Sequence, residues 1–191
     1  MLKVLLLSDF TSEYSRLLLR GFLRYSNEVG GWSFYRIPLS QNSLSENTIV
    51  KVAQRWGADA IIGQLSNISI QRLKSIGIPI ILQNYTDRVS GISNITGDYW
   101  GTGVKAANFF LKKRYKNFAF YGARPTVWSR EREDGFREKI KESGYSLTCY
   151  NEKFNIRYGS TSDLTLLGNW LKELPKPIAL FACDDAFALR I

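Results

Sequence analysis

Residues 99–122 read YWGTGVKAANFFLKKRYKNFAFYG and decide the fold class. Apolar residues recur at helical spacing over 99–113, and a basic turn follows at 114–116. Residues 117–122 then form a short aromatic and apolar run, which predicts a buried strand. A helix that leads so directly into a buried strand is typical of proteins in which strands and helices alternate.

The same alternation extends from this segment in both directions. Further strands are predicted at 3–8, 32–38, 58–64, 78–84, 93–96, 147–150 and 178–182. Further helices are predicted at 13–28, 44–56, 70–76, 130–143 and 162–174. Because every strand except the fifth is separated from the next by a crossover, the sequence predicts an α/β fold. Its parallel sheets are doubly wound, with helices on both faces.

The strand at 117–122 starts a second strand-and-helix series without a long linker, which favours two sheets over one. We therefore expect an N-terminal lobe at 1–114 and a partial C-terminal lobe at 115–191. The second series has only three strands, and residues 186–191 form an amphipathic turn without a glycine or proline stop signal. From this pattern we expect the second lobe to be truncated.

The composition disfavours several classes of function. With no histidine and two cysteines, the chain offers no zinc-ligand spacing, no disulfide framework and no histidine-based catalysis. No glycine-rich phosphate loop follows the first strand and no nucleophile has a partnered base, so we expect neither an enzyme nor a cofactor. The apolar run at 4–7 is too short for a signal peptide or a membrane span, so we expect a cytoplasmic protein without membrane contact.

The net charge of +9 suggests an acidic partner, and nucleic acid is the obvious one. However, the basic residues are spread over many predicted helix faces. The densest run comprises Lys112, Lys113, Arg114 and Lys116, and it is more typical of a helix C-terminus, where cations stabilise the negative dipole end. A dedicated nucleic-acid groove is therefore disfavoured.

Polar and aromatic side chains follow the predicted strands, where open parallel sheets bind their ligands. In the first series these are Asp9, Phe10, Tyr14, Gln64, Gln83, Asn84 and Asp98, and in the second they are Trp128, Arg132, Asp184 and Asp185. Carboxylates, amides and arginine bond hydroxyl groups, while flat rings pack on the apolar face of a sugar. The set predicts a pocket for a hydroxylated ligand.

Each candidate also has a purely structural interpretation. Asp98, and Asp184 or Asp185, precede predicted helices, where aspartate is a common N-cap. Arg132 lies among charged neighbours on the first turns of a helix, where surface ion pairs are the default explanation. Trp128 would equally well cover a sheet edge or a lobe interface. Only the joint location of the candidates at strand ends favours a ligand site.

The stretch WSREREDGF at 128–136, preceded by the FAFYG strand at 118–122, resembles sugar-binding regulators. The chain is similar to the ligand-binding domain of the lactose/galactose-repressor superfamily, which has the periplasmic-binding-protein-like type I fold. More narrowly, it resembles xylose-operon activators with an arabinose-regulator-type DNA-binding region. Weaker matches are Tyr14, Arg16, Gly21, Asp98 and the Asp184-Asp185 pair.

This resemblance implies roles for six residues. Arg132 would contact sugar hydroxyls, and Asp9, Asp98 and Asp184 would line a cleft between the lobes. Tyr14 and Trp128 are candidates for its aromatic wall. The chain has Asp98-Tyr99 and Asp184-Asp185 where the repressors usually have Asp-Asn and Asn-Asp, which puts the preferred sugar in doubt.

The resemblance also implies that the chain is the effector-binding domain of a bacterial transcription regulator. Its effector would be a sugar, a pentose such as xylose, and its DNA would be bound through a C-terminal region absent from this chain. A homodimer is expected, with closure of two lobes around the sugar as the signal. A periplasmic sugar-binding protein of a transport system shares the fold and remains an alternative. Because the second lobe is expected to be incomplete, weak or absent sugar binding is expected from these 191 residues.

Overall fold

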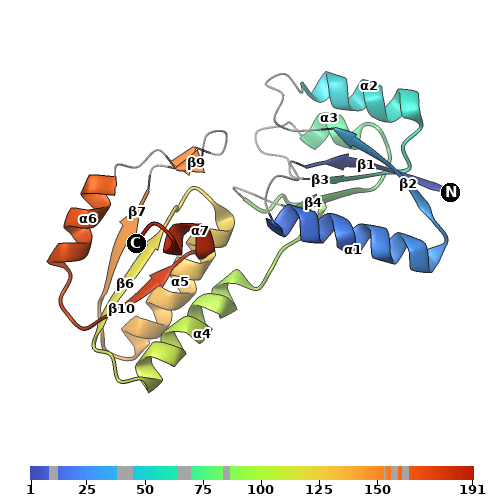
Figure 1. Ribbon diagram of the computed structural model, residues 1–191. Coiled ribbons are helices and arrows are strands. Elements are labelled where there is room, and N and C mark those ends of the chain that lie inside the picture. Colours follow the sequence, from blue (N-terminus) through green and yellow to red (C-terminus); the bar gives the residue numbers. More distant parts are fainter. Residues whose placement is uncertain are drawn as a thin grey trace. The chain divides into compact units, whose positions relative to one another are not determined.

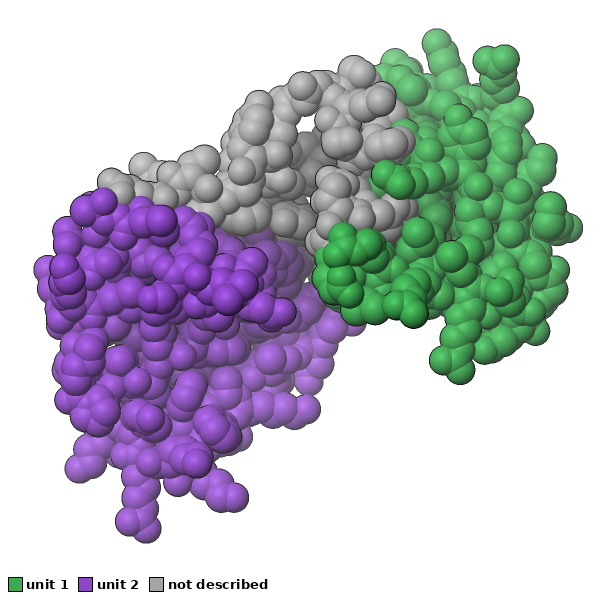
Figure 2. Space-filling model, in the orientation of Figure 1, with its two compact units in different colours: residues 1–95 green, residues 96–191 purple. Residues whose placement is uncertain are grey.

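The computed structural model describes residues 1–8, 13–37, 45–63, 70–83, 87–152, 154–155, 159–160 and 164–191. These residues form two compact units, Met1–Ile95 and Thr96–Ile191 (Figures 1 and 2). Each unit has its own parallel sheet and its own apolar core. The α/β class with separate parallel sheets is thereby confirmed.

The first unit is built on a five-stranded parallel sheet in the order β2-β1-β3-β4-β5. Its strands are β1 (Leu2–Leu7), β2 (Trp32–Ile37), β3 (Ala60–Gly63), β4 (Ile80–Gln83) and β5 (Ser93–Ile95). Its helices are α1 (Glu13–Val29), α2 (Glu46–Trp56) and α3 (Ile70–Lys74). Successive residues of β1 point to opposite faces, so Leu5 packs in the cluster with α2 and Leu6 in the cluster with α1. Helices therefore cover both faces of the sheet (Figure 1).

The second unit is built on a three-stranded parallel sheet in the order β10-β6-β7. Its strands are β6 (Asn117–Gly122), β7 (Leu147–Asn151) and β10 (Ile178–Ala182). Its helices are α4 (Tyr99–Lys112), α5 (Val127–Glu142), α6 (Leu164–Glu173) and α7 (Asp185–Ala188). The short strands β8 (Phe154–Asn155) and β9 (Gly159–Ser160) pair antiparallel, a hairpin that the sequence analysis did not anticipate.

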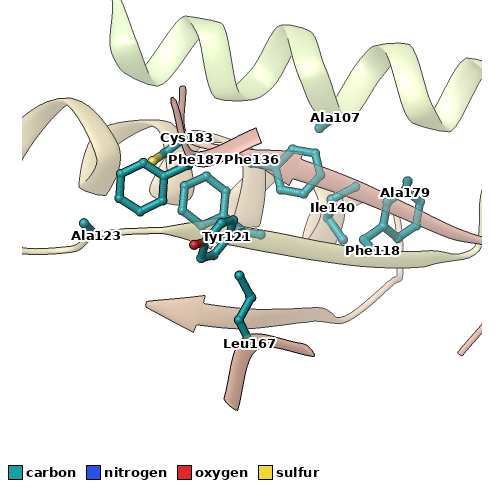
Figure 3. Close-up of a cluster of buried hydrophobic side chains, with 11 residues drawn as sticks. Ala107, Phe118, Tyr121, Ala123, Phe136, Ile140, Leu167, Ala179, Cys183 and Phe187 are labelled. Atoms are coloured by element: carbon teal, nitrogen blue, oxygen red, sulfur yellow. The ribbon is translucent and has the colours of Figure 1, made fainter. Parts of the chain in front are cut away.

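Aromatic rings fill the core of the second unit on either side of β6 (Figure 3). Phe136 of α5 is fully buried, and its ring lies 6.2 Å from that of Phe110 on α4 and 5.2 Å from that of Phe181 on β10. Leu167 of α6 packs from the opposite side of the sheet. Burial of these large side chains is the main force that holds α4, α5 and α6 on the strands.

The helices α4 and α5 approach each other closely because each has a glycine at their contact. A Cβ atom at Gly103 would collide with the carbonyl oxygen of Arg132 and lie 2.7 Å from the amide nitrogen of Phe136. A Cβ atom at Gly135 would collide with the carbonyl oxygen of Trp100. The two backbones therefore touch directly, and this contact fixes α5 at the position of Arg132.

The predicted elements are present, with ends that differ by a few residues. The helix predicted at 130–143 begins three residues earlier, at Val127, with Thr126 as its N-cap residue. The predicted strand ends at Pro38, Gln64 and Asn84 lie outside the described residues. The division between the units also differs from the predicted lobe boundary at 114/115, because α4 packs on α5 and buries Ala107 in the second core.

The contact between α4 and α5 gives the first prediction. Replacement of Gly103 by Ala places a methyl group against the backbone of α5, so we expect the free energy of unfolding to fall by about 1 to 3 kcal/mol. Gly21→Ala on α1 is the matched control, since nothing lies within 4 Å of a Cβ there. Helix propensity alone should make that variant more stable by about 0.5 to 1 kcal/mol. Urea unfolding followed by circular dichroism tests both, and equal stability of the two variants would contradict the close contact.

Candidate functional site

Three of the six predicted ligand residues lie together at the carboxyl edge of the second sheet. Trp128 and Arg132 are one turn apart on α5, and Asp184 follows the end of β10. The Nη1 atom of Arg132 donates to the carbonyl oxygen of Cys183, the residue before Asp184, at 2.6 Å. All three predicted residues are half-buried. This charge-assisted hydrogen bond ties α5 to the strand end that carries Asp184.

The guanidinium of Arg132 also contacts two aromatic rings. Its central carbon lies 5.1 Å from the ring centroid of Tyr99 and 5.8 Å from that of Trp128. The surface ion pair considered from the sequence is not formed, since Arg132 has no carboxylate within 4 Å among the described residues. A guanidinium has five N–H donors, more than the bond to Cys183 uses, so the group is suited to bind hydroxyl or carboxylate oxygens. Tyr99 is a site residue that the sequence analysis did not select.

Asp184 and Asp98 both act as helix N-caps, as their structural interpretation predicted. Asp184 accepts a hydrogen bond from the amide of Phe187 at 2.9 Å, and Asp98 accepts one from the amide of Gly101 at 2.8 Å. A carboxylate has two oxygens with several acceptor positions, so a cap bond leaves capacity for a ligand. Asp184 is half-buried beside Cys183, whereas Asp98 is exposed at the start of α4.

The remaining candidates are dispersed. Asp9 lies outside the described residues, as do Phe10, Gln64 and Asn84. Tyr14 lies on the first turn of α1 in the first unit, with 52% of its surface exposed. Gln83 is buried at the end of β4. The part of the candidate site that the structure brings together therefore belongs to the second unit.

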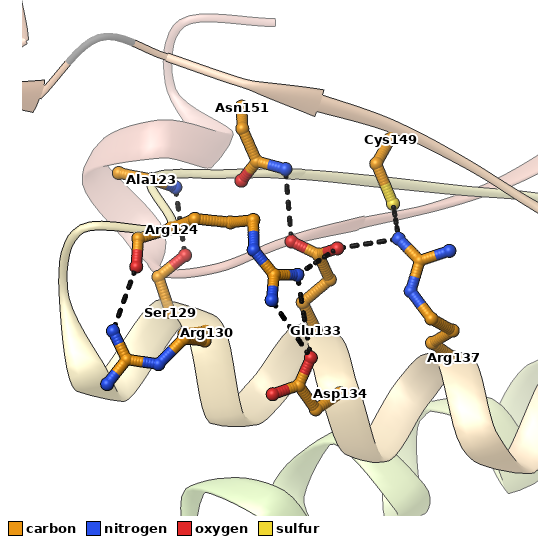
Figure 4. Close-up of polar contacts among 9 residues, drawn as sticks. All are labelled: Ala123, Arg124, Ser129, Arg130, Glu133, Asp134, Arg137, Cys149 and Asn151. Atoms are coloured by element: carbon orange, nitrogen blue, oxygen red, sulfur yellow. Dashed lines mark hydrogen bonds and ion pairs between the residues drawn. The ribbon is translucent and has the colours of Figure 1, made fainter.

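Glu133 is a buried carboxylate that the sequence analysis assigned to a charged helix surface (Figure 4). Its side chain is 1% exposed, and it accepts hydrogen bonds from Arg124 at 2.7 Å, Arg137 at 2.6 Å and Asn151 at 3.0 Å. Asn151 ends β7 and Arg124 follows β6, so the carboxylate joins two strand ends to α5. It shares one buried helix face with positions 129, 136 and 140, but 129 and 133 are polar, so hydrophobic periodicity in the sequence does not mark this face.

The surroundings of Glu133 keep it ionised. Burial alone would raise its pKa, but the hydrogen bonds from Arg137 and Asn151 and the positive charges of Arg124 and Arg137 outweigh burial. The pKa of Glu133 is therefore lowered from its usual value of 4.5. A buried carboxylate that is fully bonded in this way stabilises one geometry of the strand ends.

A second buried carboxylate, Glu152, joins the end of β7 to the residues after α7. It accepts hydrogen bonds from the hydroxyl of Tyr121 and, at 2.7 Å, from the guanidinium of Arg190. Burial and the neighbouring carboxylate raise the pKa of Tyr121, so its hydroxyl remains a neutral donor. Because α7 is clamped in this way, the Asp184 cap at its start has a defined position. The sequence analysis did not select Glu152, Tyr121 or Arg190.

The two cysteines are poor candidates for reactive groups. Burial raises the pKa of both Cys149 and Cys183 to about 12, and the charges of Glu133 and Asp184, respectively, act in the same direction. Across the described ranges, no group of three histidine, cysteine or acidic residues could hold a metal ion. None of the helices in those ranges combines the length and the apolar character needed to cross a membrane.

Glu133 gives the second prediction. Glu133→Gln removes the charge between Arg124 and Arg137, and we expect the free energy of unfolding at neutral pH to fall by about 1 to 3 kcal/mol. Both arginines are more than 40% exposed, so solvent screens part of the loss. Asp134→Asn is the matched control on the same helix, since its pair with Arg124 is long, at 3.5 Å, and exposed. That control should change stability by less than about 0.5 kcal/mol.

The pH dependence of the stability lost in Glu133→Gln tests whether the charge of Glu133 is the cause. The folded-state pKa of Glu133 is lowered, so its contribution is present above the usual value of 4.5 and is lost as the pH falls through the lower folded value. The stability difference between the wild-type protein and Glu133→Gln should therefore be largest near neutral pH and shrink below 4.5. Urea titrations at several pH values measure it, and a difference that grows on acidification would refute the assignment.

Comparisons with known proteins are consistent with this fold. The model of the periplasmic binding protein-like domain family matches residues 107–191, which is less than half of the chain. No curated protein matches the sequence. Solved structures match over nearly the whole chain, at low sequence identity.

Three of these structures illustrate the likeness. The transcription regulator CcpA of Lactococcus lactis is 15% identical, with a TM-score of 0.72 over 100% of this chain and 71% of its own. The xylose-binding transcription activator XylR is 23% identical, with a TM-score of 0.74 over 99% of this chain and 48% of its own. A periplasmic binding protein/LacI transcriptional regulator from Alkaliphilus metalliredigens, complexed with D-xylulofuranose, is 14% identical, with a TM-score of 0.68 over 88% of this chain and 65% of its own. The chain thus spans less than two thirds of the last two proteins, and it has the periplasmic-binding-protein-like type I fold.

Proposed function

We propose that this chain is the effector-binding domain of a bacterial transcription regulator that acts in the cytoplasm, and that its effector is a sugar, a pentose such as xylose. The observation that carries the proposal is the guanidinium of Arg132, which contacts the rings of Tyr99 and Trp128 and donates to the carbonyl oxygen of Cys183, beside Asp184. This group lies at the carboxyl edge of a parallel sheet, where α/β proteins of this kind bind ligands.

The chemistry of this group fits a hydroxylated ring. Each sugar hydroxyl both donates and accepts, so the cation of Arg132 and the carboxylate of Asp184, the residue after its hydrogen-bond acceptor Cys183, supply complementary partners. Arg132 would donate to hydroxyl oxygens, and the free lone pairs of Asp184 would accept hydroxyl protons. The rings of Tyr99 and Trp128 would pack against the C–H face of the sugar. A site with bonded polar groups discriminates strongly, because a ligand that lacks a matching hydroxyl leaves them unpaired.

The names of two similar structures support a five-carbon ligand. One protein is described as a xylose-binding activator and another was solved with D-xylulofuranose. The resemblance of residues 128–136 to sugar-binding regulators supports Arg132 as the principal contact. The same resemblance supports Asp9, Tyr14 and Asp98 as further contacts to the sugar. No observation specifically favours a transport protein.

In this proposal the sugar acts by population shift. A ligand that binds one arrangement of the two units more tightly than the others raises the population of that arrangement. A shift in the ratio of two arrangements from 1:99 to 99:1 requires about a 10⁴-fold difference in the affinity of the sugar for them. The signal would pass to a dimer partner and to a DNA-binding region outside these 191 residues.

Arg132 gives the third prediction. Isothermal titration calorimetry of the full-length protein against pentoses and hexoses should show one preferred sugar, and Arg132→Ala should weaken its binding by about 10- to 100-fold, the value of one or two hydrogen bonds to a charged group. Arg24→Ala, which removes an exposed arginine from α1, is the matched control and should bind normally. Binding that is indifferent to Arg132 would remove the basis of the proposed site.

Asp184 gives the fourth prediction, which separates its capping role from its ligand role. Asparagine caps helices about as well as aspartate, so Asp184→Asn should leave the thermal midpoint unchanged. The loss of the charged acceptor should still weaken sugar binding by about tenfold. Asp184→Ala should lower stability as well, by about 1 kcal/mol. Unchanged sugar binding by Asp184→Asn would show that Asp184 caps the helix and does not contact the sugar through its charge.

A further inference from the structure

The C-termini of three helices meet at the amino edge of the second sheet. The helices α4, α5 and α6 each lead into a strand of the same parallel sheet, β6, β7 and β10 respectively. The starts of these strands are aligned, since Asn117 pairs with Ile178 and Phe118 with Leu147. The Asn117 side chain also donates to the carbonyl oxygen of Pro177 at 3.1 Å. The three helix-to-strand connections therefore lie side by side (Figure 1).

These connections concentrate the positive charge of the chain. Residues 112–116, 139–146 and 172–177, which we call the basic edge, contain eight basic and two acidic side chains. The basic side chains are Lys112, Lys113, Arg114, Lys116, Lys139, Lys141, Lys172 and Lys176, and the acidic ones are Glu142 and Glu173. The excess of six positive charges is two thirds of the +9 of the whole chain. The fold thus gathers charges that look scattered along the sequence.

Most of this charge is not neutralised within the described residues. Lys139 pairs with Glu142 at 2.9 Å, and Lys176 donates to the carbonyl oxygen of Leu171 at 2.7 Å. In the described ranges, Lys112 and Lys116 form no ion pair and are exposed. The helix C-termini contribute only about half a negative charge each, which is less than the excess. The basic edge is therefore a strongly positive surface.

We propose that the basic edge binds the phosphate backbone of duplex DNA without reading its sequence. Flexible lysines on separate segments suit closely spaced phosphates, which duplex DNA presents about every 1.7 Å along its axis. An anionic membrane is a poorer fit, because surface-bound helices present an apolar face to lipid. Phe109 on α4 and Leu164 and Leu166 on α6 are exposed, but the basic charge lies at the C-terminal ends of the helices and not along one side of an apolar helix face.

This contact goes beyond the proposed function, which places DNA recognition outside the chain. It is also separate from the sugar site. Arg132 and Asp184 lie at the carboxyl ends of the strands, whereas the basic edge lies at their amino ends. The length of β6 puts about 17 Å between these edges. A DNA contact here would hold the effector domain near its operator while the carboxyl edge remains accessible.

The fifth prediction concerns the lysines of the first connection. Fluorescence anisotropy with a labelled duplex of arbitrary sequence, about two helical turns long, should show binding by the 191-residue chain that weakens steeply between about 50 and 200 mM salt. In the triple variant Lys112→Gln, Lys113→Gln and Lys116→Gln, the slope of log affinity against log salt should decrease by about three. Affinity at the lowest salt should fall at least about tenfold.

The control removes the same charge from the first unit. Lys51→Gln, Arg55→Gln and Lys74→Gln alter exposed positions on α2 and α3 and should leave affinity and salt slope unchanged. Equal losses in both variants would mean that net charge alone attracts DNA, and this would overturn the basic edge. Absence of binding by the wild-type chain would also overturn it.

Two further measurements distinguish DNA binding from membrane binding and from the sugar site. Vesicles of phosphatidylserine and phosphatidylcholine replace the duplex in one arm, and binding to vesicles but not to DNA would overturn the proposal in favour of a membrane. In the other arm Arg132→Ala is titrated with the duplex and should bind it like the wild-type chain. Failure of the sugar site and failure of the basic edge are therefore distinguishable. An unchanged circular dichroism spectrum confirms that the lysine variants fold.

Discussion

The direct contact between the backbones of α4 and α5 is the constraint on which the candidate site depends. Glycine at 103 and at 135 lets the two helices touch, and a methyl group at either position would meet a carbonyl oxygen of the other helix. One of these carbonyls belongs to Arg132. Tyr99, on the first turn of α4, is thereby brought to the guanidinium of Arg132. Close packing of the helices brings the cation to its aromatic neighbours, and the hydrogen bond to Cys183 holds its guanidinium there.

Two buried carboxylates then fix the strand ends around this cation. Glu133 joins β6 and β7 to α5, and Glu152 joins the end of β7 to the residues after α7. Burial of a charge is costly unless its partners are in place, so each cluster stabilises a single arrangement of its segments. These bonds hold the polar groups of the carboxyl edge in one arrangement, and groups held in this way lose little entropy when they bind a ligand.

Because all strands of a parallel sheet run in one direction, its two edges carry different kinds of side chains. At the carboxyl edge of the second sheet, β10 leads into the N-terminus of α7, where Asp184 caps the amide of Phe187 and remains able to accept further bonds. At the amino edge, helix C-termini lead into strands, and basic residues are favoured there by the helix dipole. One sheet thus presents a mixed polar site at one end and a positive surface at the other.

The sequence by itself determined the alternation of strands and helices, the parallel sheets and the two helix caps. These features follow from periodicity and from residue preferences over a few neighbouring positions. Only the tertiary structure decided that Glu133 is buried between arginines, that Tyr99 contacts Arg132 and that α4 belongs to the second unit. These depend on which distant segments touch, and charge at position 133 looks the same in the sequence whether the helix face is solvated or packed. Hydrophobic periodicity is local, whereas burial, ion pairing and the meeting of three helix ends arise only when separate segments pack together.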